Sequence, residues 1–312
     1  YLMPNKIILK KRISNFNKKI SIPGDKSISI RWVLISSLAN GISKAKNLLM
    51  SDDVLASIQA IKKLGVKVIV KKNFCKIHGV GVNGYNYKKN ISINARNSGT
   101  LGRLISGILI DSPFPIKIVG DKSLSKRDFL RVTRPLSNFG ARFQTNSGKL
   151  PVYVNGTNKP KPISFYENKG SAQCKSSIML AALNTKGITK IKAKKSRNHT
   201  ELLFKYLNLP IKIYKDKKFD YINIHGGKQI KPINYKIPAD ISSSAFFIIL
   251  TALSKNSKIN IKNVNINPTR TGILKILKLM GIKIKTNNER IYKGEKIADL
   301  YVESTKKLKS IN

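Results

Sequence analysis

SISIRWVLISSLANGISKAKNLLMSDDVLASIQAIKKLGVKVIV, residues 27–70, is the stretch that decides the fold. Its apolar run from Ser27 to Leu38 predicts a helix, and a second, amphipathic helix begins after Ser51, a residue type that caps helix N-termini. Gly65 ends this second helix, and the alternation of apolar and basic residues from Val66 to Val70 predicts a strand. Helices and strands therefore alternate, which is typical of an α/β protein.

The same order of elements recurs along the chain. Helix-like runs begin near Lys26, Ser98, Ala172 and Ser242, so the repeat length is about 70 to 75 residues. In each repeat the first helix is followed by a strand, a second amphipathic helix and a turn into further strands. We therefore predict four copies of a βαβαββ unit, each of them longer than the repeats of a solenoid protein.

A polar stretch with two prolines, residues 230–238, separates the third repeat from the fourth and predicts a linker. The three repeats before it are expected to form one complete domain, residues 22–232. The fourth repeat lies in residues 233–312 and is expected to be the first repeat of a second domain. If the second domain matched the first, it would require two further repeats, about 140 residues, after Asn312.

The composition argues against several kinds of site. The two cysteines, Cys75 and Cys174, lie far apart and the three histidines are scattered, so we predict neither disulfides nor a metal site. The apolar runs are shorter than the ~20 residues that a membrane-spanning helix requires. We expect a reduced, cytoplasmic and monomeric protein.

The chain carries 60 Lys and Arg against 15 Asp and Glu, a formal net charge of +45. Such an excess occurs in proteins that bind nucleic acids, membrane surfaces or small anions. Many lysines alternate with Ile or Val, as solvent-facing strand residues do, and the few aromatic residues do not interleave with Arg as base-stacking surfaces require. Small anions are the favoured ligands, and a basic nucleic-acid-binding module is the alternative from another class.

The segment Pro23-Gly24-Asp25-Lys26-Ser27-Ile28-Ser29-Ile30-Arg31 leads into the first predicted helix. A helix N-terminus presents unpaired N–H groups and the positive end of the helix dipole, which favour anions. The cations Lys26 and Arg31 and the hydroxyl of Ser27 lie in the first two turns. They predict a phosphate or carboxylate site, although the spacing is not that of a nucleotide-binding P-loop.

Similar polar segments precede or begin other predicted helices: Asn97–Arg103, Gly120–Arg127, Gly170–Ser177 and Ser196–Glu201. Glycine allows the backbone to approach a ligand closely, and the planar guanidinium of Arg binds both oxygens of a carboxylate or phosphate. One such segment is usually a solvated helix cap. Several in one chain predict a shared anion site.

Together these segments resemble the signatures of the 3-phosphoshikimate 1-carboxyvinyltransferase (EPSP synthase) family. The similar pairs are residues 23–31 with PGDKSISHR, 97–103 with NSGTxxR, 120–127 with GDxSLxxRP, 171–183 with SAQVKSAxLLAGL and 196–201 with SRDHTE. Residues 240–247 and 267–272 resemble the GDxSSAAFF and NPTRTG segments. The resemblance extends in the correct order from about Ile20 to Glu303.

The resemblance implies an inside-out α/β architecture of two domains, each built from three βαβαββ repeats, with the active site in the cleft between them. Residues 1–21 would belong to the C-terminal domain, which would be incomplete. The implied reaction transfers the enolpyruvyl group of phosphoenolpyruvate to the 5-hydroxyl of 3-phosphoshikimate and releases phosphate, in the synthesis of chorismate and aromatic amino acids. This chemistry needs no metal or organic cofactor.

The resemblance also implies roles for individual residues. Lys26 would be catalytic, as an acid or base tuned by neighbouring cations. The residues that would bind 3-phosphoshikimate are Lys26, Ser27, Arg31, Ser171, Ala172, Gln173 and Arg197, with Ser196 as a further candidate. The residues that would bind phosphoenolpyruvate are Lys26, Gly99, Arg127 and Gln173.

Three residues depart from the family pattern: Ile30 replaces a His, Asp128 a Pro and Cys174 a Val. The Asp128 carboxylate would weaken phosphoenolpyruvate binding if it pointed into the site. The family's catalytic aspartate, a glutamate, two further arginines and a lysine have no counterpart in these 312 residues. We therefore expect this chain alone to have little or no transferase activity.

An alternative within the same architecture is enolpyruvyl transfer to UDP-N-acetylglucosamine. Residues 120–127 and 171–173 fit the shikimate branch better, and Cys174 is not placed like the loop cysteine of the UDP-sugar enzyme. The nucleic-acid alternative predicts DNA binding that weakens steeply with salt.

Overall fold

The structure is a computed structural model, in which residues 13–72 and 74–311 are described. The first twelve residues of the predicted segment 1–21 lie outside this description. The described residues form two compact units. The larger unit contains Pro23–Pro238 and Tyr292–Glu295, and the smaller contains the described residues up to Ile22, Ala239–Ile291 and the segment from Lys296.

All eight predicted helices are present in the described residues, and their ends differ from the predicted ones by a few residues. They are α1 (Lys26–Ser37), α2 (Asp52–Lys63), α3 (Gly99–Ile108), α4 (Leu130–Ser137), α5 (Ala172–Leu183), α6 (His199–Tyr206), α7 (Ile241–Leu253) and α8 (Gly272–Leu279). The first helix of every repeat has the same kind of N-terminal cap. The side chains of Asp25, Ser98, Ser171 and Asp240 each accept a hydrogen bond from a backbone N–H in the first turn of α1, α3, α5 and α7.

Each repeat contributes to one four-stranded sheet. The larger unit contains the sheets β13-β2-β4-β3, β5-β6-β8-β7 and β9-β10-β12-β11, and the smaller contains β1-β14-β16-β15. Their strands are β1 (Asn17–Ile20), β2 (Asn40–Lys46), β3 (Lys67–Lys71), β4 (Phe74–Val80), β5 (Ile91–Asn94), β6 (Ile116–Val119), β7 (Arg142–Asn146), β8 (Lys149–Asn155), β9 (Ser164–Glu167), β10 (Ile188–Lys194), β11 (Ile211–Lys215), β12 (Phe219–His225), β13 (Asn234–Lys236), β14 (Lys258–Asn265), β15 (Ile284–Tyr292) and β16 (Glu295–Glu303). In all four sheets the first strand is parallel to the second, and the second is antiparallel to the third.

The first strand of two sheets comes from a distant part of the chain. Strand β13 follows the third repeat but pairs with β2 of the first, in the register Asn234 with Lys44. Strand β1 precedes the first repeat but pairs with β14 of the fourth, in the register Asn17 with Lys258. The βαβαββ outline is therefore complete in each sheet, although the first and fourth repeats obtain their first strand by pairing across a long sequence separation.

The segment 230–238, which we predicted as a linker, belongs to the larger unit, and the boundary between the two units follows it at Pro238. Ile230, Ile233, Tyr235 and Ile237 are each at most 4% exposed, and the segment contains β13. Polar residues alternate with these apolar ones, as expected of a strand with one buried face. The Trp32 indole also donates a hydrogen bond to the Ile233 carbonyl oxygen over 3.0 Å, which fixes the segment to α1.

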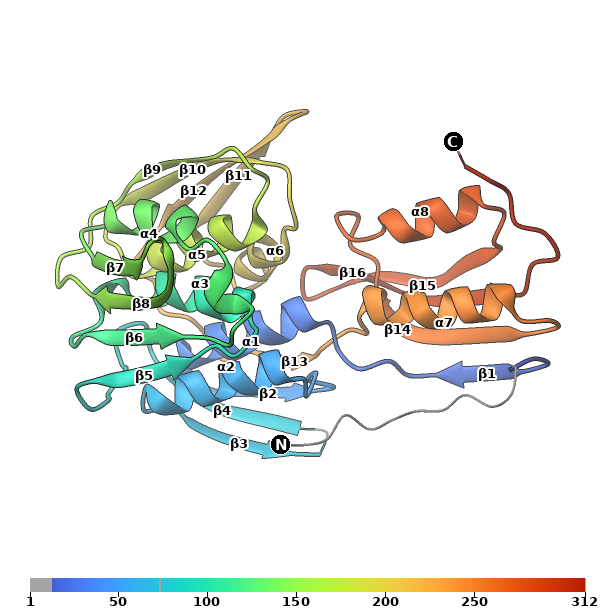
Figure 1. Ribbon diagram of the computed structural model, residues 1–312, viewed down its shortest axis with the longest axis horizontal. Coiled ribbons are helices and arrows are strands. Elements are labelled where there is room, and N and C mark those ends of the chain that lie inside the picture. Colours follow the sequence, from blue (N-terminus) through green and yellow to red (C-terminus); the bar gives the residue numbers. More distant parts are fainter. Residues whose placement is uncertain (1–12, 73, 312) are drawn as a thin grey trace. The chain divides into compact units, whose positions relative to one another are not determined.

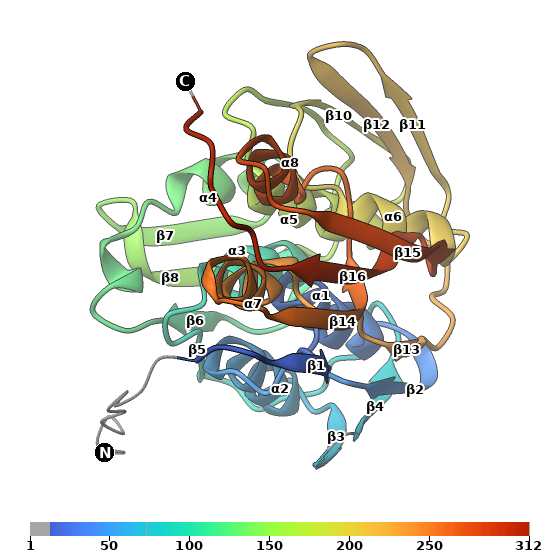
Figure 2. The ribbon, with the colours of Figure 1, turned by 90° about the vertical axis from the view of Figure 1, so that its right-hand side faces the viewer.

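Helices α1, α3 and α5 form the centre of the larger unit, and the three sheets lie around them (Figures 1 and 2). Every residue of α1 from Ile28 to Ser37 is buried, so this helix has no solvent-facing side. Helices α3 and α5 approach closely because Gly107 has no side chain. A Cβ atom there would lie 2.1 Å from the Ser177 carbonyl oxygen.

The smaller unit contains one sheet and the helices α7 and α8. Its core includes Ile248 and Ala252 of α7 and Ile261 of β14, all of them fully buried. The remaining apolar residues of α7 are more exposed. Phe246 is 77% exposed and Leu253 is 64% exposed, so α7 buries only part of its apolar surface within the described residues.

Candidate active site

The N-terminal turn of α1 holds the predicted catalytic residue Lys26. The Asp25 carboxylate accepts a hydrogen bond of 3.0 Å from the Ile28 amide and so fixes the start of the helix. The Lys26 ammonium is half-exposed, and its Nζ lies 3.6 Å from Oδ2 of Asp53 on α2. The Asp53 carboxylate is thus one charged neighbour of Lys26. Ser27, the next residue, is half-buried.

Arg31 lies one turn further along α1 and is only 3% exposed. Its Nε donates to Oγ1 of Thr200 on α6 over 2.8 Å, and its NH2 group donates to Oγ of Ser176 on α5 over 3.0 Å. A third bond runs to the backbone oxygen of Ser27. Burial lowers the pKa of Arg31 to about 10, an effect that Glu201 opposes, so the guanidinium remains charged at neutral pH.

The start of α3 brings two guanidinium groups to Gly99. A Cβ atom on Gly99 would lie 2.8 Å from one terminal nitrogen of Arg103 and 3.4 Å from one of Arg127. Glycine at this position therefore lets both cations approach the helix N-terminus. Arg127 also donates a hydrogen bond to the Asn97 side-chain oxygen over 3.4 Å and is exposed.

The loop that carries Arg127 is ordered by Asp121. Its carboxylate accepts hydrogen bonds from the Leu124 amide over 2.7 Å and from the Asn97 side-chain amide over 2.6 Å. These bonds stabilise the ionised carboxylate and lower the pKa of Asp121, with the Leu124 amide as the largest cause. Asp121 thereby joins the loop to the segment that begins α3.

The start of α5 contacts α3 through Gln173. Its Nε2 donates to Oγ1 of Thr100 over 2.9 Å, while its Oε1 accepts from Arg103 over 2.5 Å. Ser171 caps the same helix, and its own amide donates to the Glu167 carboxylate over 2.9 Å. Ala172, the first residue of α5, is half-buried. The N-terminal turns of α3 and α5 therefore lie side by side.

Arg197 and Ser196 precede α6, the helix that provides Thr200. Arg197 is exposed, and its charge contributes to the lowered pKa of Arg31, so the two guanidinium groups are electrostatically coupled. The Ser196 Oγ atom is buried and has no hydrogen-bond partner among the described residues. A buried hydroxyl of this kind is a donor available to a ligand oxygen.

Most of the predicted residues thus belong to one connected arrangement. Arg31 joins α1 to α5 and α6, Gln173 joins α5 to α3, and the Gly99 segment adjoins Arg127. Three helix N-termini and several cations meet there, an arrangement suited to phosphate and carboxylate groups. In the described residues no group of His, Cys, Asp and Glu could hold a metal ion, and no helix is long and apolar enough to cross a membrane.

Arg103 and Asp53 are not among the predicted site residues, although both contact residues that are. Arg103 follows Gly99 by one helical turn, so the spacing of the two residues could have identified it. Asp53 could not be identified in this way, because it lies on α2, and only the packing of α2 against α1 brings it to Lys26.

The three residues that depart from the family pattern lie in different surroundings. Ile30 is fully buried in the core, where an apolar side chain packs without a hydrogen-bond partner. The Asp128 carboxylate accepts a hydrogen bond from the Leu130 amide over 2.7 Å at the start of α4. Cys174 is buried within the first turn of α5.

The smaller unit has a polar cluster of its own. The Asp240 carboxylate caps α7, and a terminal nitrogen of Arg270 lies 3.4 Å from its Oδ1. The same nitrogen donates to Oγ of Ser242 over 2.8 Å. Residues 240–247 and 267–272, which are distant in the sequence, therefore meet in this unit.

The repeated sheets define an α/β protein, and the cations at several helix N-termini are typical of sites suited to small anions. The sequence profile of the EPSP synthase (3-phosphoshikimate 1-carboxyvinyltransferase) family matches residues 10–311. The chain belongs to this family.

Individual relatives agree with this assignment. The 3-phosphoshikimate 1-carboxyvinyltransferase of Vesicomyosocius okutanii is 42% identical over 286 residues, which are 91% of this chain and 65% of the relative. That of Thermoanaerobacter sp. is 42% identical over 94% of this chain and 68% of the relative. The solved structure of EPSP synthase from Acinetobacter baumannii superimposes with a TM-score of 0.87 at 36% identity and covers 96% of this chain and 67% of that one. The chain thus spans about two thirds of the length of these relatives, and the predicted EPSP synthase-like fold is confirmed.

Proposed function

We propose that this chain takes part in the transfer of the enolpyruvyl group of phosphoenolpyruvate to the 5-hydroxyl of 3-phosphoshikimate, with release of phosphate. The observation that carries the proposal is the joining of α1, α3 and α5 by Arg31 and Gln173 at their N-terminal turns. The names of the relatives support the shikimate branch over transfer to UDP-N-acetylglucosamine.

In this proposal 3-phosphoshikimate is bound by Lys26, Ser27, Arg31, Ser171, Ala172, Gln173 and Arg197. The half-buried N–H groups at the starts of α1 and α5 and the cations around them offset the charge of its phosphate and carboxylate. Phosphoenolpyruvate is bound by Lys26, Gly99, Arg127 and Gln173. The close approach of two guanidinium groups to Gly99 supports this assignment, since no acidic side chain forms an ion pair with Arg103 or Arg127 among the described residues.

Lys26 is proposed as the proton-transfer residue. A general acid or base acts at hydrogen-bonding distance from the reacting atoms, and Lys26 is a half-exposed cation at a helix N-terminus. Its contact with Asp53 holds the ammonium group near α2 in the absence of substrate. Substrate anions would compete with Asp53 for this ammonium group.

Binding of 3-phosphoshikimate to the 312-residue chain, measured by isothermal titration calorimetry, tests the proposal. We expect saturable one-to-one binding that Lys26→Met weakens by about tenfold to a hundredfold, because a hydrogen bond to a charged group contributes roughly 1.5–3 kcal/mol. Lys62→Met, at an exposed lysine of α2, is the matched control and should leave the affinity unchanged. Equal losses in the two variants, or no saturable binding to the unaltered chain, would refute the assignment.

A further inference from the structure

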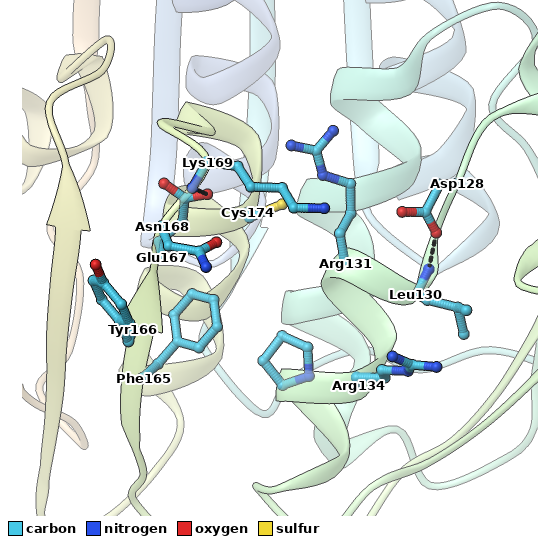
Figure 3. A pocket seen from close by; sticks show the side chains of 11 residues that line it. Asp128, Leu130, Arg131, Arg134, Phe165, Tyr166, Glu167, Asn168, Lys169 and Cys174 are labelled. Carbon is cyan, nitrogen blue, oxygen red and sulfur yellow. Dashed lines mark hydrogen bonds between the residues drawn. The ribbon is translucent and has the colours of Figure 1, made fainter.

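A cavity of about 530 Å³ lies in the larger unit between α4 and the segment that runs from β9 into α5 (Figure 3). Its volume is within the range of pockets that hold small organic ligands. None of the residues proposed above to bind substrate lines it. The lining residues are Asp128, Leu130, Arg131, Arg134, Pro135, Phe165, Tyr166, Glu167, Asn168, Lys169 and Cys174.

One part of the cavity wall is apolar. Phe165 and Tyr166 come from β9, Leu130 and Pro135 from α4, and Cys174 from the first turn of α5. Pro135 and Cys174 are buried, and Phe165 is half-buried, so the cavity exposes the edges of residues that otherwise pack in the core. Such a wall favours a flat apolar group over a fully hydrated ion.

The other part of the wall is cationic. Arg131, Arg134 and Lys169 form no ion pair with any described residue. Figure 3 shows Lys169 extending across the cavity towards Arg131, so two like charges converge there. An anion between these side chains would remove the repulsion between them.

The two acidic residues of the wall are already engaged by backbone amides. The Glu167 carboxylate accepts hydrogen bonds from the amides of Lys169, over 3.0 Å, and Ser171, over 2.9 Å. The Asp128 carboxylate accepts one from the Leu130 amide (Figure 3). Both carboxylates are therefore hydrogen-bonded to the main chain. The cationic side chains Arg131, Arg134 and Lys169 outnumber them in the cavity wall.

Arg131 supplies the observation that points to a ligand. Its Nε atom is buried and has no hydrogen-bond partner among the described residues. A buried donor without a partner is unfavourable, and the terminal nitrogens of the same guanidinium form a planar fork that matches a carboxylate. A ligand carboxylate would bind these terminal nitrogens and pair with Lys169.

We propose that this cavity binds a small aromatic carboxylate, with the carboxylate at Arg131 and Lys169 and the ring against Phe165 and Pro135. The site is separate from the candidate active site but close to it along the chain. Asp128 follows Arg127 and Cys174 follows Gln173, and the Asp128 carbonyl oxygen accepts a hydrogen bond of 3.1 Å from Arg103. The proposal does not depend on the transferase reaction.

The test uses 2-naphthoate as the probe and the 312-residue chain, with binding followed by isothermal titration calorimetry and saturation-transfer NMR. We expect saturable one-to-one binding. Two probes separate the contributions of charge and ring: 2-naphthylmethylamine has the ring with the opposite charge, and acetate has the carboxylate alone. Both should bind at least tenfold more weakly than 2-naphthoate. An amine that binds as tightly as 2-naphthoate would overturn the proposed role of the cations.

Variants locate the binding. Arg131→Met should weaken 2-naphthoate at least tenfold, whereas Arg131→Lys should retain part of the affinity. Arg142→Met, the same change at an exposed arginine of β7 outside the cavity, is the control and should have no effect. Thermal unfolding followed by circular dichroism confirms that each variant is folded. Equal affinities of Arg131→Met and Arg142→Met would overturn the proposal.

A competition experiment separates this site from the active site. Saturating 3-phosphoshikimate should leave 2-naphthoate bound, because the residues proposed for the two ligands do not overlap. Displacement of the probe by 3-phosphoshikimate would assign 2-naphthoate to the active site and overturn the proposal of a separate site. If the chain binds 2-naphthoate but not 3-phosphoshikimate, the cavity proposal stands and the proposed function fails.

Discussion

Helices α1 and α7 begin equivalent repeats, yet their surroundings differ. Both follow a capping aspartate, Asp25 or Asp240, and both are predominantly apolar. In the larger unit α1 is buried on all sides, whereas α7 leaves Phe246 and Leu253 largely exposed. One βαβαββ repeat therefore does not bury its own first helix. Burial of that helix depends on the neighbouring repeats, as in other proteins built from repeated units.

The largest effect is expected for Trp32→Ala in α1. Trp32 is fully buried, and its indole N–H donates to the Ile233 carbonyl oxygen. Truncation leaves a cavity and removes one of the two hydrogen bonds to that carbonyl, the other of which comes from the Lys44 amide. The free energy of unfolding of the larger unit should therefore fall by about 3–5 kcal/mol. Urea unfolding followed by circular dichroism measures this loss, because the substitution removes the only tryptophan of the chain and with it the fluorescence signal. A loss below about 1 kcal/mol would contradict the central position of α1.

Close packing between first helices is tested by Gly107→Ala in α3. The new Cβ would meet the Ser177 carbonyl oxygen at 2.1 Å, so α3 and α5 would have to separate. We expect a loss of about 2–3 kcal/mol in the free energy of unfolding of the larger unit, measured by tryptophan fluorescence in urea.

Gly272→Ala at the start of α8 is the matched control in the smaller unit. No atom lies within 4 Å of the Cβ position there. The substitution should change stability by less than about 1 kcal/mol, and alanine is the better helix former. If both glycine variants behaved alike, the contact at Gly107 would not be what holds α3 and α5 together.

The sequence predicted the helices better than the strand pairing. The helical period and the end signals Ser51 and Gly65 are local, so the helices could be placed from the sequence alone, although the Ser51 side chain makes no capping hydrogen bond. The pairing of β13 with β2 joins residues about 190 positions apart, as in the hydrogen bond between Ile233 and Ser43, and no local pattern specifies it. For the same reason the alternating residues of 230–238 were interpreted as a linker.

In the candidate site, too, the local motifs could be identified from the sequence and the long-range contacts could not. Lys26, Ser27 and Arg31 are within one motif, so the motif identifies them. Asp53 is brought to Lys26 by the packing of two helices, and this tertiary contact has no signature at either residue. Motif resemblance thus identifies the residues of the site, whereas their partners follow only from the fold.

Two carboxylates extend the comparison of the units to pH. Asp111, in the larger unit, lacks a cationic partner among the described residues, and burial raises its pKa to about 6. In the smaller unit burial also tends to raise the pKa of Asp299, but hydrogen bonds from Lys262, Asn263 and Asn288 lower it overall. The two groups should therefore affect stability in opposite directions.

The folded pKa of Asp111 lies above the unfolded value of 3.8. Its protonated form stabilises the native state at low pH, and this contribution is lost as the pH rises through about 6. Asp111→Asn removes this titrating group. Relative to the unaltered chain, the free energy of unfolding of the variant should therefore be about 2 kcal/mol higher at pH 7.5 than at pH 4.5. The side-chain oxygen of the new Asn still accepts the hydrogen bond from Asn184. Tryptophan fluorescence in urea at both pH values measures this difference.

Asp299→Asn is the control with the opposite sign. The contribution of a lowered pKa is present above the unfolded value and is lost as the pH falls. This variant should destabilise the smaller unit at pH 7.5 and have less effect at low pH, as followed by hydrogen exchange of β14 and β16. Identical pH dependence of the two variants would show that the salt bridge between Lys262 and Asp299 does not set the behaviour of the smaller unit.

The smallest effect is expected for Phe246→Ala in α7. Its side chain is 77% exposed, so truncation removes little buried surface, and the free energy of unfolding of the smaller unit should change by less than about 0.5 kcal/mol. Ile248→Ala, at a fully buried position of the same helix, should cost about 2–5 kcal/mol and serves as the positive control. Hydrogen exchange of β14 reports both. A loss above about 2 kcal/mol for Phe246→Ala would mean that this face of α7 is covered in solution, and sedimentation velocity would then show whether a second copy of the chain covers it.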